Sequence, residues 1–358
     1  MQGYMALEFP SRSSRPFGEL PDGREANLFT LSNGSGLSCD ITNYGGIVTA
    51  LRVTRSDQPE IDVVLGFNTL EDYLGPHPFF GTLVGRVAGR ISGAKFLLDN
   101  REHPLDANDA PNHLHGGSIG FDKQLWKAEL VESAKEASLS LSYLSPDGEE
   151  GYPGNVRAWV TYAVTPKNEL VIHHGAETDQ STPLSLTNHS YFNLAGEGSG
   201  DIFSHLLLVF SDEIAATDAA MTLLGYRAQV TWEANDFNHP RRLGDAVPML
   251  LNNHGDNHFI RRFRKGELTQ TAILKHPASG LTMTTLTTQD TVQIYSAAIL
   301  DGSLIGKSGS PNVKHAGICL ECQGCPGAVH TPALGDIILC PGDRYHHLTV
   351  YAFTFDQI

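Results

Sequence analysis

The sequence predicts an all-β fold with few short helices. The 36 glycines and 19 prolines are spread throughout the 358 residues, which is typical of many turns between short strands. Several segments alternate apolar and polar residues with a period of two, as half-buried strands do. The chain has no internal repeat, low-complexity linker or change of composition. We therefore expect one β domain over residues 17–358, preceded by a loose tail over residues 1–16.

Composition and charge limit the class of protein. A hydrophobic content of 41% is that of a soluble globular protein. The net charge of −15 argues against a nucleic-acid partner and against an anionic membrane, because both require clustered Lys and Arg. No apolar stretch approaches the ~18 residues of a membrane span, and the N-terminus lacks a signal-peptide core. Without a secretory signal, the five cysteines are expected to be reduced thiols of a cytoplasmic protein.

The first predicted strands lie near the N-terminus. Residues 37–53 alternate in polarity around two adjacent glycines, as two paired strands joined by a bend would. Residues 61–67 form another predicted strand, and residues 69–74 could make one helical turn. From residue 139 onward the alternation is plain. Further strands are expected at residues 139–145, 156–165, 170–178, 205–210, 272–286, 292–295, 317–321 and 348–355.

Two motifs in the first third of the chain could carry chemistry. The run GRVAGRI (85–91) contains Arg90 among small residues, where a guanidinium could bind vicinal hydroxyls or a carboxylate. An arginine salt-bridged at the rim of a sheet explains the same residue equally well. His113 and His115 have a metal-ligand spacing if both rings lie on one face of a strand. No third ligand lies at a recognisable spacing, so we favour a histidine presented at a pocket mouth by the following Gly-Gly turn.

His189 lies within the apolar, strand-prone run LTNHSYFNL (186–194). A histidine has an unperturbed pKa near ~6.5, so it can give or take a proton at neutral pH. Taken alone, such a residue is more often a half-buried histidine with both nitrogens satisfied. The cysteines at 319, 322 and 325 lack the close fourth cysteine of an iron–sulfur run, and no G-x-S-x-G elbow supplies a serine nucleophile. We expect no metal and no cofactor.

Taken together, several blocks resemble the aldose 1-epimerase (galactose mutarotase) family from about Phe17 to Phe355. The blocks are GRVAGRI (85–91), NHLHGGSIGFDKQLW (112–126), SPDGEEGYPG (145–154), LSLTNHSYFNL (184–194), TTQDTVQIY (287–295), GICLECQ (317–323) and LCPGDRYHHLTVYAF (339–353). The resemblance implies a large antiparallel β-supersandwich, in agreement with the strand-rich pattern. It also implies a cofactor-independent isomerase that interconverts the α and β anomers of free hexopyranoses such as glucose and galactose.

The resemblance further implies a role for individual residues. Glu321 stands where the family has its general base, and His189 where the family has its general acid. The positions that hold the ring oxygen and hydroxyls of the sugar are Arg90, His115, Asp256 and Gln293. Interconverting anomers means removing the proton of the anomeric hydroxyl while protonating the ring oxygen, so that the ring opens, turns and recloses. This chemistry needs one acid and one base, which we expect on opposite sides of the sugar ring.

The chain departs from the family pattern close to these positions. Gly89 replaces an asparagine, Asn257 replaces a histidine, and Gly324 and Gly327 fall in a segment where the family reads Q-H-aromatic-P-D. These changes leave the preferred sugar open. One alternative is a same-fold enzyme acting on a different hemiacetal or cyclic metabolite. Another is a non-catalytic sugar-binding protein, although the presence of both acid and base argues against a pure binder.

Overall fold

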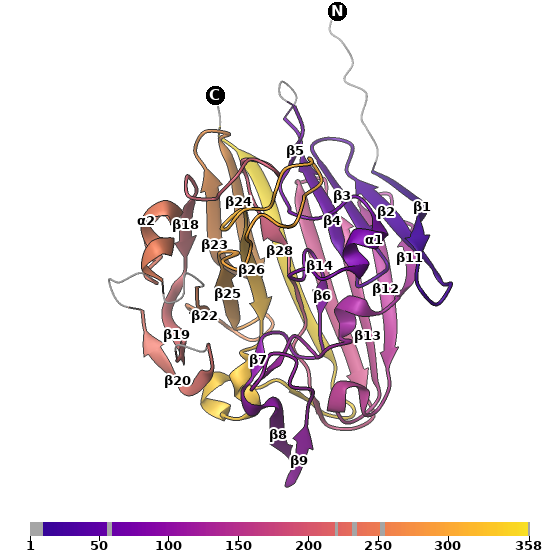
Figure 1. Cartoon of the computed structure of the whole chain (residues 1–358), viewed down its shortest axis with the longest axis vertical. Coiled ribbons are helices and arrows are strands. Elements are labelled where there is room, and N and C mark those ends of the chain that lie inside the picture. Colours follow the sequence, from indigo (N-terminus) through magenta and orange to yellow (C-terminus); the bar gives the residue numbers. More distant parts are fainter. Residues whose placement is uncertain (1–9, 56–58, 219–220, 231–234, 251–254, 357–358) are drawn as a thin grey trace, which may run out of the picture.

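The computed structural model describes residues 10–55, 59–218, 221–230, 235–250 and 255–356, and most of its regular structure is β-strand (Figure 1). The largest sheet has nine strands, and neighbouring strands run antiparallel. In spatial order its strands are β11 (Lys127–Val131), β12 (Ala137–Ser145), β13 (Val156–Val164), β14 (Glu169–Thr178), β28 (Tyr345–Phe355), β24 (Leu281–Thr287), β23 (Thr269–His276), β18 (Leu206–Val209) and β21 (Arg241–Arg242).

Two further sheets pack against this one. The six-stranded sheet contains β17 (Tyr191–Phe192), β26 (Ile318–Gln323), β25 (Thr291–Tyr295), β22 (Asn257–Ile260), β19 (Ser211–Thr217) and β20 (Leu223–Gln229). The five-stranded sheet contains β1 (Ser11–Glu19), β2 (Glu25–Ser32), β3 (Leu37–Thr42), β4 (Val48–Val53) and β5 (Ile61–Asp62).

Short elements complete the architecture. The two-stranded pairs are β6 (Leu83–Val84) with β16 (Thr187–Asn188), β7 (Arg90–Ile91) with β10 (His113–Leu114), β8 (Lys95–Leu98) with β9 (Arg101–Pro104), and β15 (Thr182–Pro183) with β27 (Ile338–Leu339). The α-helices are α1 (Leu70–Leu74) and α2 (Leu243–Ala246), and the 3₁₀ turns are Ser92–Ala94, Phe121–Lys123, Glu149–Gly151, Val247–Met249, Pro326–Val329 and Pro332–Leu334. Within the described residues, no helix is long and apolar enough to span a bilayer.

A continuous apolar core lies between the sheets. It contains Ile41 from the five-stranded sheet, Leu320 from the six-stranded sheet and Phe353 from the nine-stranded sheet, all buried. Two tyrosine hydroxyls of the large sheet cross this core to backbone carbonyls. Tyr162 donates to the Gly46 oxygen at 2.7 Å, and Tyr351 donates to the Leu320 oxygen at 2.9 Å. Both small sheets are therefore tied to the same large one, which is the arrangement of a β-supersandwich.

The structure corrects two local predictions. The expected tail over residues 1–16 is wrong for its second part, because β1 begins at Ser11 and pairs with β2 along its length. Residues 1–9 lie outside the described residues. The predicted segment 272–286 is two strands, β23 and β24, which a turn at residues 277–280 joins into a hairpin. The division into one domain stays a prediction.

Candidate active site

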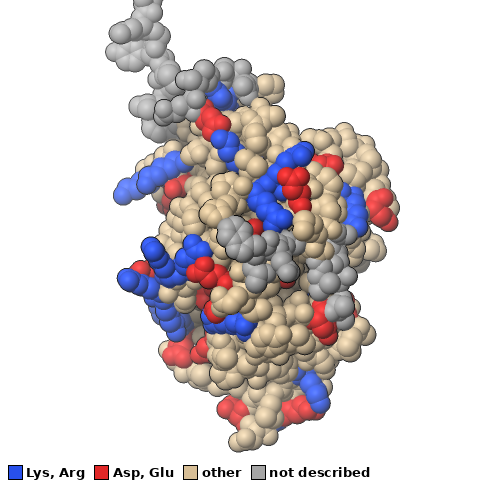
Figure 2. All heavy atoms as spheres, turned by 90° about the vertical axis from the view of Figure 1, so that its left-hand side faces the viewer, with Lys and Arg blue, Asp and Glu red and all other residues tan. Residues whose placement is uncertain are grey.

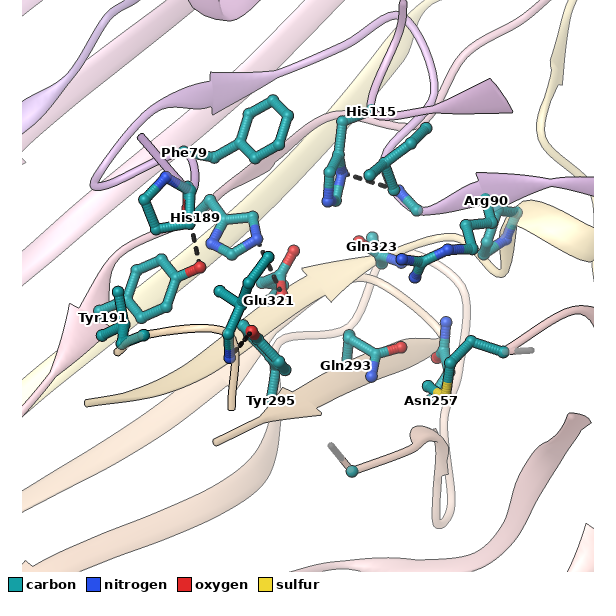
Figure 3. A pocket seen from close by; sticks show the side chains of 18 of the residues that line it. Phe79, Arg90, His115, His189, Tyr191, Asn257, Gln293, Tyr295, Glu321 and Gln323 are labelled. Carbon is teal, nitrogen blue, oxygen red and sulfur yellow. Dashed lines mark hydrogen bonds and ion pairs between the residues drawn. The ribbon is translucent and has the colours of Figure 1, made fainter. Parts of the chain in front are cut away.

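A cavity of about 490 Å³ opens beside the six-stranded sheet, between β25, β26 and the loops around β7 and β10 (Figure 3). All six residues singled out in the sequence line it: Arg90, His115, His189, Asp256, Gln293 and Glu321. Aromatic and aliphatic side chains make up much of the remaining wall, among them Phe79, Tyr191 and Tyr295. A mostly apolar hollow with a few convergent polar groups is the usual form of a small-molecule site.

Two adjacent strands form one wall of the cavity. Residues two apart on a strand face the same side, so β26 presents Cys319, Glu321 and Gln323 on one face. Gln293 on β25 is the register partner of Glu321. The Glu321 side chain is almost completely buried, and this burial raises its pKa to about 8, although the nearby Arg90 charge acts in the opposite direction. Burial therefore favours the protonated form of the carboxyl.

His189 lies in the connection between β16 and β17, directly above Glu321 in Figure 3. Its Nε2 is 3.6 Å from Glu321 Oε1, and its Nδ1 is 3.5 Å from Cys319 Sγ. Phe79 and Tyr191 stack on its ring with interplanar angles of 22° and 23°. Burial lowers the pKa of His189 to about 4, so the imidazole is uncharged at neutral pH. Between these two pKa values, about 4 and about 8, His189 and Glu321 therefore hold one titratable proton between them.

This geometry corrects the expectation that the acid and base lie on opposite sides of the sugar ring. The two side chains are neighbours, with 3.6 Å between Nε2 and Oε1. The anomeric hydroxyl and the ring oxygen of a pyranose are bonded to the same carbon atom. Adjacent groups can therefore reach both oxygens from one edge of the ring.

His115 occupies the local structure that the sequence analysis favoured. His113 belongs to β10 and bonds to Tyr152 Oη at 2.8 Å, whereas His115 has a φ of 53° and turns toward the cavity. The two rings therefore do not share the strand face that the alternative, a metal-ligand pair, would need. The expected presentation at a Gly-Gly turn is confirmed. Gly116 is required there, because a Cβ at this position would lie 1.8 Å from the Gly85 carbonyl oxygen.

A backbone hydrogen bond fixes the tautomer of His115. The Gly89 N–H donates to His115 Nδ1 at 3.1 Å, so a neutral ring carries its proton on Nε2. Burial lowers the pKa of His115 well below its ordinary value, which keeps the ring neutral. Phe79 contacts its ring with 4.7 Å between centroids, and Phe79 itself has a φ of 59°, a rare conformation for a bulky residue. His115 can thus donate one hydrogen bond to an oxygen acceptor.

The two arginines of the GRVAGRI run have separate functions. Arg86 is buried and donates to Ser145 and to the Pro146 and Pro153 carbonyls, so its role is structural. Arg90 lines the cavity and also donates from Nε to Asp109 Oδ2 at 2.7 Å. The salt-bridge interpretation of Arg90 is therefore confirmed, and its contact with a ligand stays a prediction. The salt bridge fixes one edge of a guanidinium whose side chain faces the cavity.

Unpaired acceptors complete the cavity. Among the described residues, three buried oxygens that lack a hydrogen-bond partner belong to its lining: Asn257 Oδ1, Glu321 Oε2 and Gln323 Oε1. Asp256 is partly buried, and this burial raises its pKa to about 6. Buried polar atoms are normally paired, so this set suits a ligand with several hydroxyl donors.

Gln323 could have been found from its spacing to Glu321, whereas no sequence signal pointed to Phe79 or Cys319.

One group of residues could be read as a metal site. The ligand atoms of His115, His189 and Glu321 lie within 4.8 Å of one another, a spatial cluster that the spacing of the sequence did not reveal. Zinc binding by two histidines and a carboxylate needs an unprotonated nitrogen on each ring facing the ion. The Gly89 amide already uses the lone pair of His115 Nδ1, which places a proton on the nitrogen that would have to bind. We therefore assign no metal to the cluster.

Comparison with known proteins identifies the family. The aldose 1-epimerase model matches residues 27–352. The chain is 42% identical to galactose mutarotase of Rattus norvegicus over 339 residues, which cover 94% of this chain and 97% of that protein. The chain belongs to the aldose 1-epimerase family. It is also 30% identical to aldose 1-epimerase of Escherichia coli, over 93% of this chain and 96% of that protein. Membership makes this chain an enzyme of the isomerase class.

Solved structures of the family share the fold. The GalM/aldose epimerase homologue from C. elegans superposes with a TM-score of 0.83 at 25% identity, covering 97% of this chain and 100% of that one. Galactose 1-epimerase from Lactobacillus acidophilus superposes with a TM-score of 0.84 at 24% identity and the same coverage. The predicted all-β supersandwich is therefore confirmed.

Gly89, which stands where the family pattern has asparagine, lies against Pro326 and Gln323. Gly89 has a φ of 81°, and a Cβ there would lie 2.8 Å from Pro326 Cγ and 3.3 Å from Gln323 Nε2. Asparagine tolerates this backbone region, so the proline ring rather than the backbone opposes a side chain at this position. Pro326 lies in the altered segment after β26. The departure at Gly89 therefore faces a proline that the chain shares with the family pattern, and both residues line the cavity.

Proposed function

We propose that the enzyme interconverts the α and β anomers of free hexopyranoses such as glucose and galactose. The observation that carries this proposal is the buried Glu321–His189 pair, set in a cavity rich in unpaired hydrogen-bond acceptors. Relatives at 41–42% identity that carry the name galactose mutarotase support the choice of sugar.

In this mechanism Glu321 removes the proton of the anomeric hydroxyl while His189 protonates the ring oxygen. The ring opens to the aldehyde, turns about the first C–C bond and recloses on the other face. Arg90 and the Nε2–H of His115 would hold the ring oxygen as its charge changes. Asp256 and Gln293, which also face the cavity, would hold hydroxyls of the sugar.

The reaction requires the shared proton to move before catalysis. Burial favours a protonated Glu321 beside a neutral His189, and transfer of that proton gives a carboxylate base and an imidazolium acid. The guanidinium of Arg90 favours the transfer, because its charge lowers the pKa of Glu321. Hydrogen bonds from sugar hydroxyls to the carboxylate would act in the same direction.

We expect kcat/KM to depend on pH as a bell with limbs near pH 4 and pH 8, the values to which burial brings the two pKa values. Below the lower limb a second proton occupies the pair and no base remains. Above the upper limb the shared proton is lost and no acid remains. Both values belong to the coupled pair. Initial polarimetric rates against pH measure the profile, with circular dichroism at each pH as the control for folding. Activity that rises steadily beyond pH 9 would contradict it.

Polarimetry on freshly dissolved α-D-glucose and α-D-galactose tests the function itself. A faster approach to the same final rotation, lost when the protein is heat-denatured, is the expected result. The ratio of the two rates ranks the sugars. If a folded sample accelerates neither reaction, the proposal is wrong for these sugars. The alternative substrate is then a different hemiacetal, which the departures at Gly89 and Asn257 favour.

We also propose a cytoplasmic location and no nucleic-acid or membrane partner. All five cysteines are free thiols, as suits a reducing compartment. On the face seen in Figure 2, basic and acidic side chains are interspersed over the described atoms, without the basic stripe that phosphate backbones require. Oxidation of the thiols in protein purified from cells would oppose the assignment of compartment.

A further inference from the structure

One strand of the site, β26, contacts both nitrogens of His189. Cys319 and Glu321 are two residues apart and share a face of the strand. Cys319 Sγ is 3.5 Å from Nδ1, and Glu321 Oε1 is 3.6 Å from Nε2. Glu321 already has a role in the proposed mechanism, whereas Cys319 has none. Cys319 is fully buried, so it cannot contact the sugar as a surface nucleophile would.

The rings stacked on His189 fix the plane of its imidazole but do not fix which edge of the ring faces which neighbour. Phe79 and Tyr191 lie nearly parallel to the imidazole and therefore hold the plane of its ring. A rotation of 180° about the Cβ–Cγ bond keeps that plane but exchanges the nitrogen edge for the carbon edge. Stacking alone cannot choose between these two orientations. A hydrogen bond at Nδ1 can choose, because a carbon atom would replace the nitrogen after the rotation.

The surroundings of the thiol decide the direction of this hydrogen bond. The Tyr191 hydroxyl donates its single proton to the Pro78 carbonyl at 2.7 Å. The same hydroxyl interacts with the Cys319 thiol and has no second proton to give it, so a hydrogen bond between the two neutral groups would run from S–H to the tyrosine oxygen. The sulfur lone pairs are then left for the Nδ1–H of His189. Burial raises the pKa of Cys319 well above its ordinary value, so the thiol remains neutral and keeps its proton.

We propose that Cys319 is a positioning residue that fixes the ring orientation and tautomer of His189. With the proton on Nδ1, the lone pair of Nε2 faces Glu321 and is the place where the shared proton arrives before it passes to the ring oxygen. A neutral thiol is a weak acceptor and stabilises the imidazolium only slightly, whereas a carboxylate at this position would make His189 a weaker acid. The inference rests on the proposed role of His189 as the acid, and it makes that role depend on Cys319.

Three variants test the role by kinetics. Cys319→Ala is expected to lower kcat about 5- to 20-fold, the effect of one weak hydrogen bond, with KM changed less than about twofold. Cys319→Ser can still accept from Nδ1 and should recover kcat to within about threefold of the wild type. Cys322→Ala is the matched control, because Cys322 is an equally buried thiol on the opposite face of the same strand. Its kcat should stay unchanged. Equal kcat in the alanine and serine variants would overturn the proposal.

A second measurement uses the wild-type protein and does not depend on activity. In a sample with ¹⁵N-labelled histidine, the His189 signals are identified by their loss in the His189→Gln variant. We expect one pyrrole-like nitrogen at Nδ1 and one pyridine-like nitrogen at Nε2 at neutral pH. The opposite tautomer would overturn the proposal. Absence of mutarotation with the expected tautomer would instead place the failure in the proposed function.

Discussion

Replacing Glu321 with glutamine is expected to lower kcat for mutarotation by about 10²- to 10⁴-fold, the usual contribution of a positioned acid–base group. The amide has nearly the same shape as the carboxyl and can still hydrogen-bond a sugar. It cannot accept the proton of the anomeric hydroxyl, nor can it supply the proton that His189 needs. Polarimetric rates at saturating galactose measure the loss, and calorimetric titration should find sugar affinity within a few-fold of the wild type.

Asp290→Asn is the matched control for this substitution. Asp290 is partly buried, and burial also raises its pKa, to about 6, but it does not line the cavity. The same exchange of carboxyl for amide there should leave kcat essentially unchanged. Near-native activity of Glu321→Gln would show that the assigned base is wrong.

Replacing Arg86 with methionine is expected to lower the free energy of unfolding by about 2–4 kcal/mol, because several buried acceptors lose their donor. The guanidinium is buried, with 2% of the residue exposed, and donates to Ser145 Oγ at 2.8 Å and to the Pro146 and Pro153 carbonyls at 2.8 and 3.0 Å. Methionine fills much of the volume but leaves these acceptors without a donor. Urea unfolding followed by tryptophan fluorescence measures the change.

Arg157→Met provides the comparison for this loss of stability. Arg157 is exposed on β13, next to the strand that carries Ser145, and its removal should change stability by less than about 0.5 kcal/mol. If both variants unfold at the same urea concentration as the wild type, the structural role of Arg86 is wrong.

The alternation of polarity was sufficient to locate most long strands, because each buries one face. It could not give their order. β14 pairs with β28, whose register places Leu170 opposite Tyr351, and no local pattern encodes such a distant pairing. The start of β1 was missed for a different reason. Most of its side chains are exposed, and the backbone hydrogen bonds that hold it to β2 leave no trace in polarity.

The candidate site followed from the resemblance to a family rather than from spacing. Arg90, His189 and Glu321 come from distant parts of the chain and meet only when the sheets pack. The spacing of His113 and His115 also fits a metal-ligand pair on a strand face, and only the left-handed backbone at His115 excludes that alternative. Cys319 looked like an ordinary strand residue, and its contact with His189 depends on tertiary packing that the sequence does not display.

The contact between Gly89 and Pro326 also limits how this sequence can evolve. A single change of Gly89 to asparagine, the residue common in the family, would place a side chain 2.8 Å from the proline ring. The family pattern has a proline at the position of Pro326, so a side chain at position 89 fits beside it only if the proline ring lies elsewhere. Gly324 and Gly327 belong to the same segment as this proline, so the effect of a substitution at position 89 is expected to depend on the residues at 324 and 327.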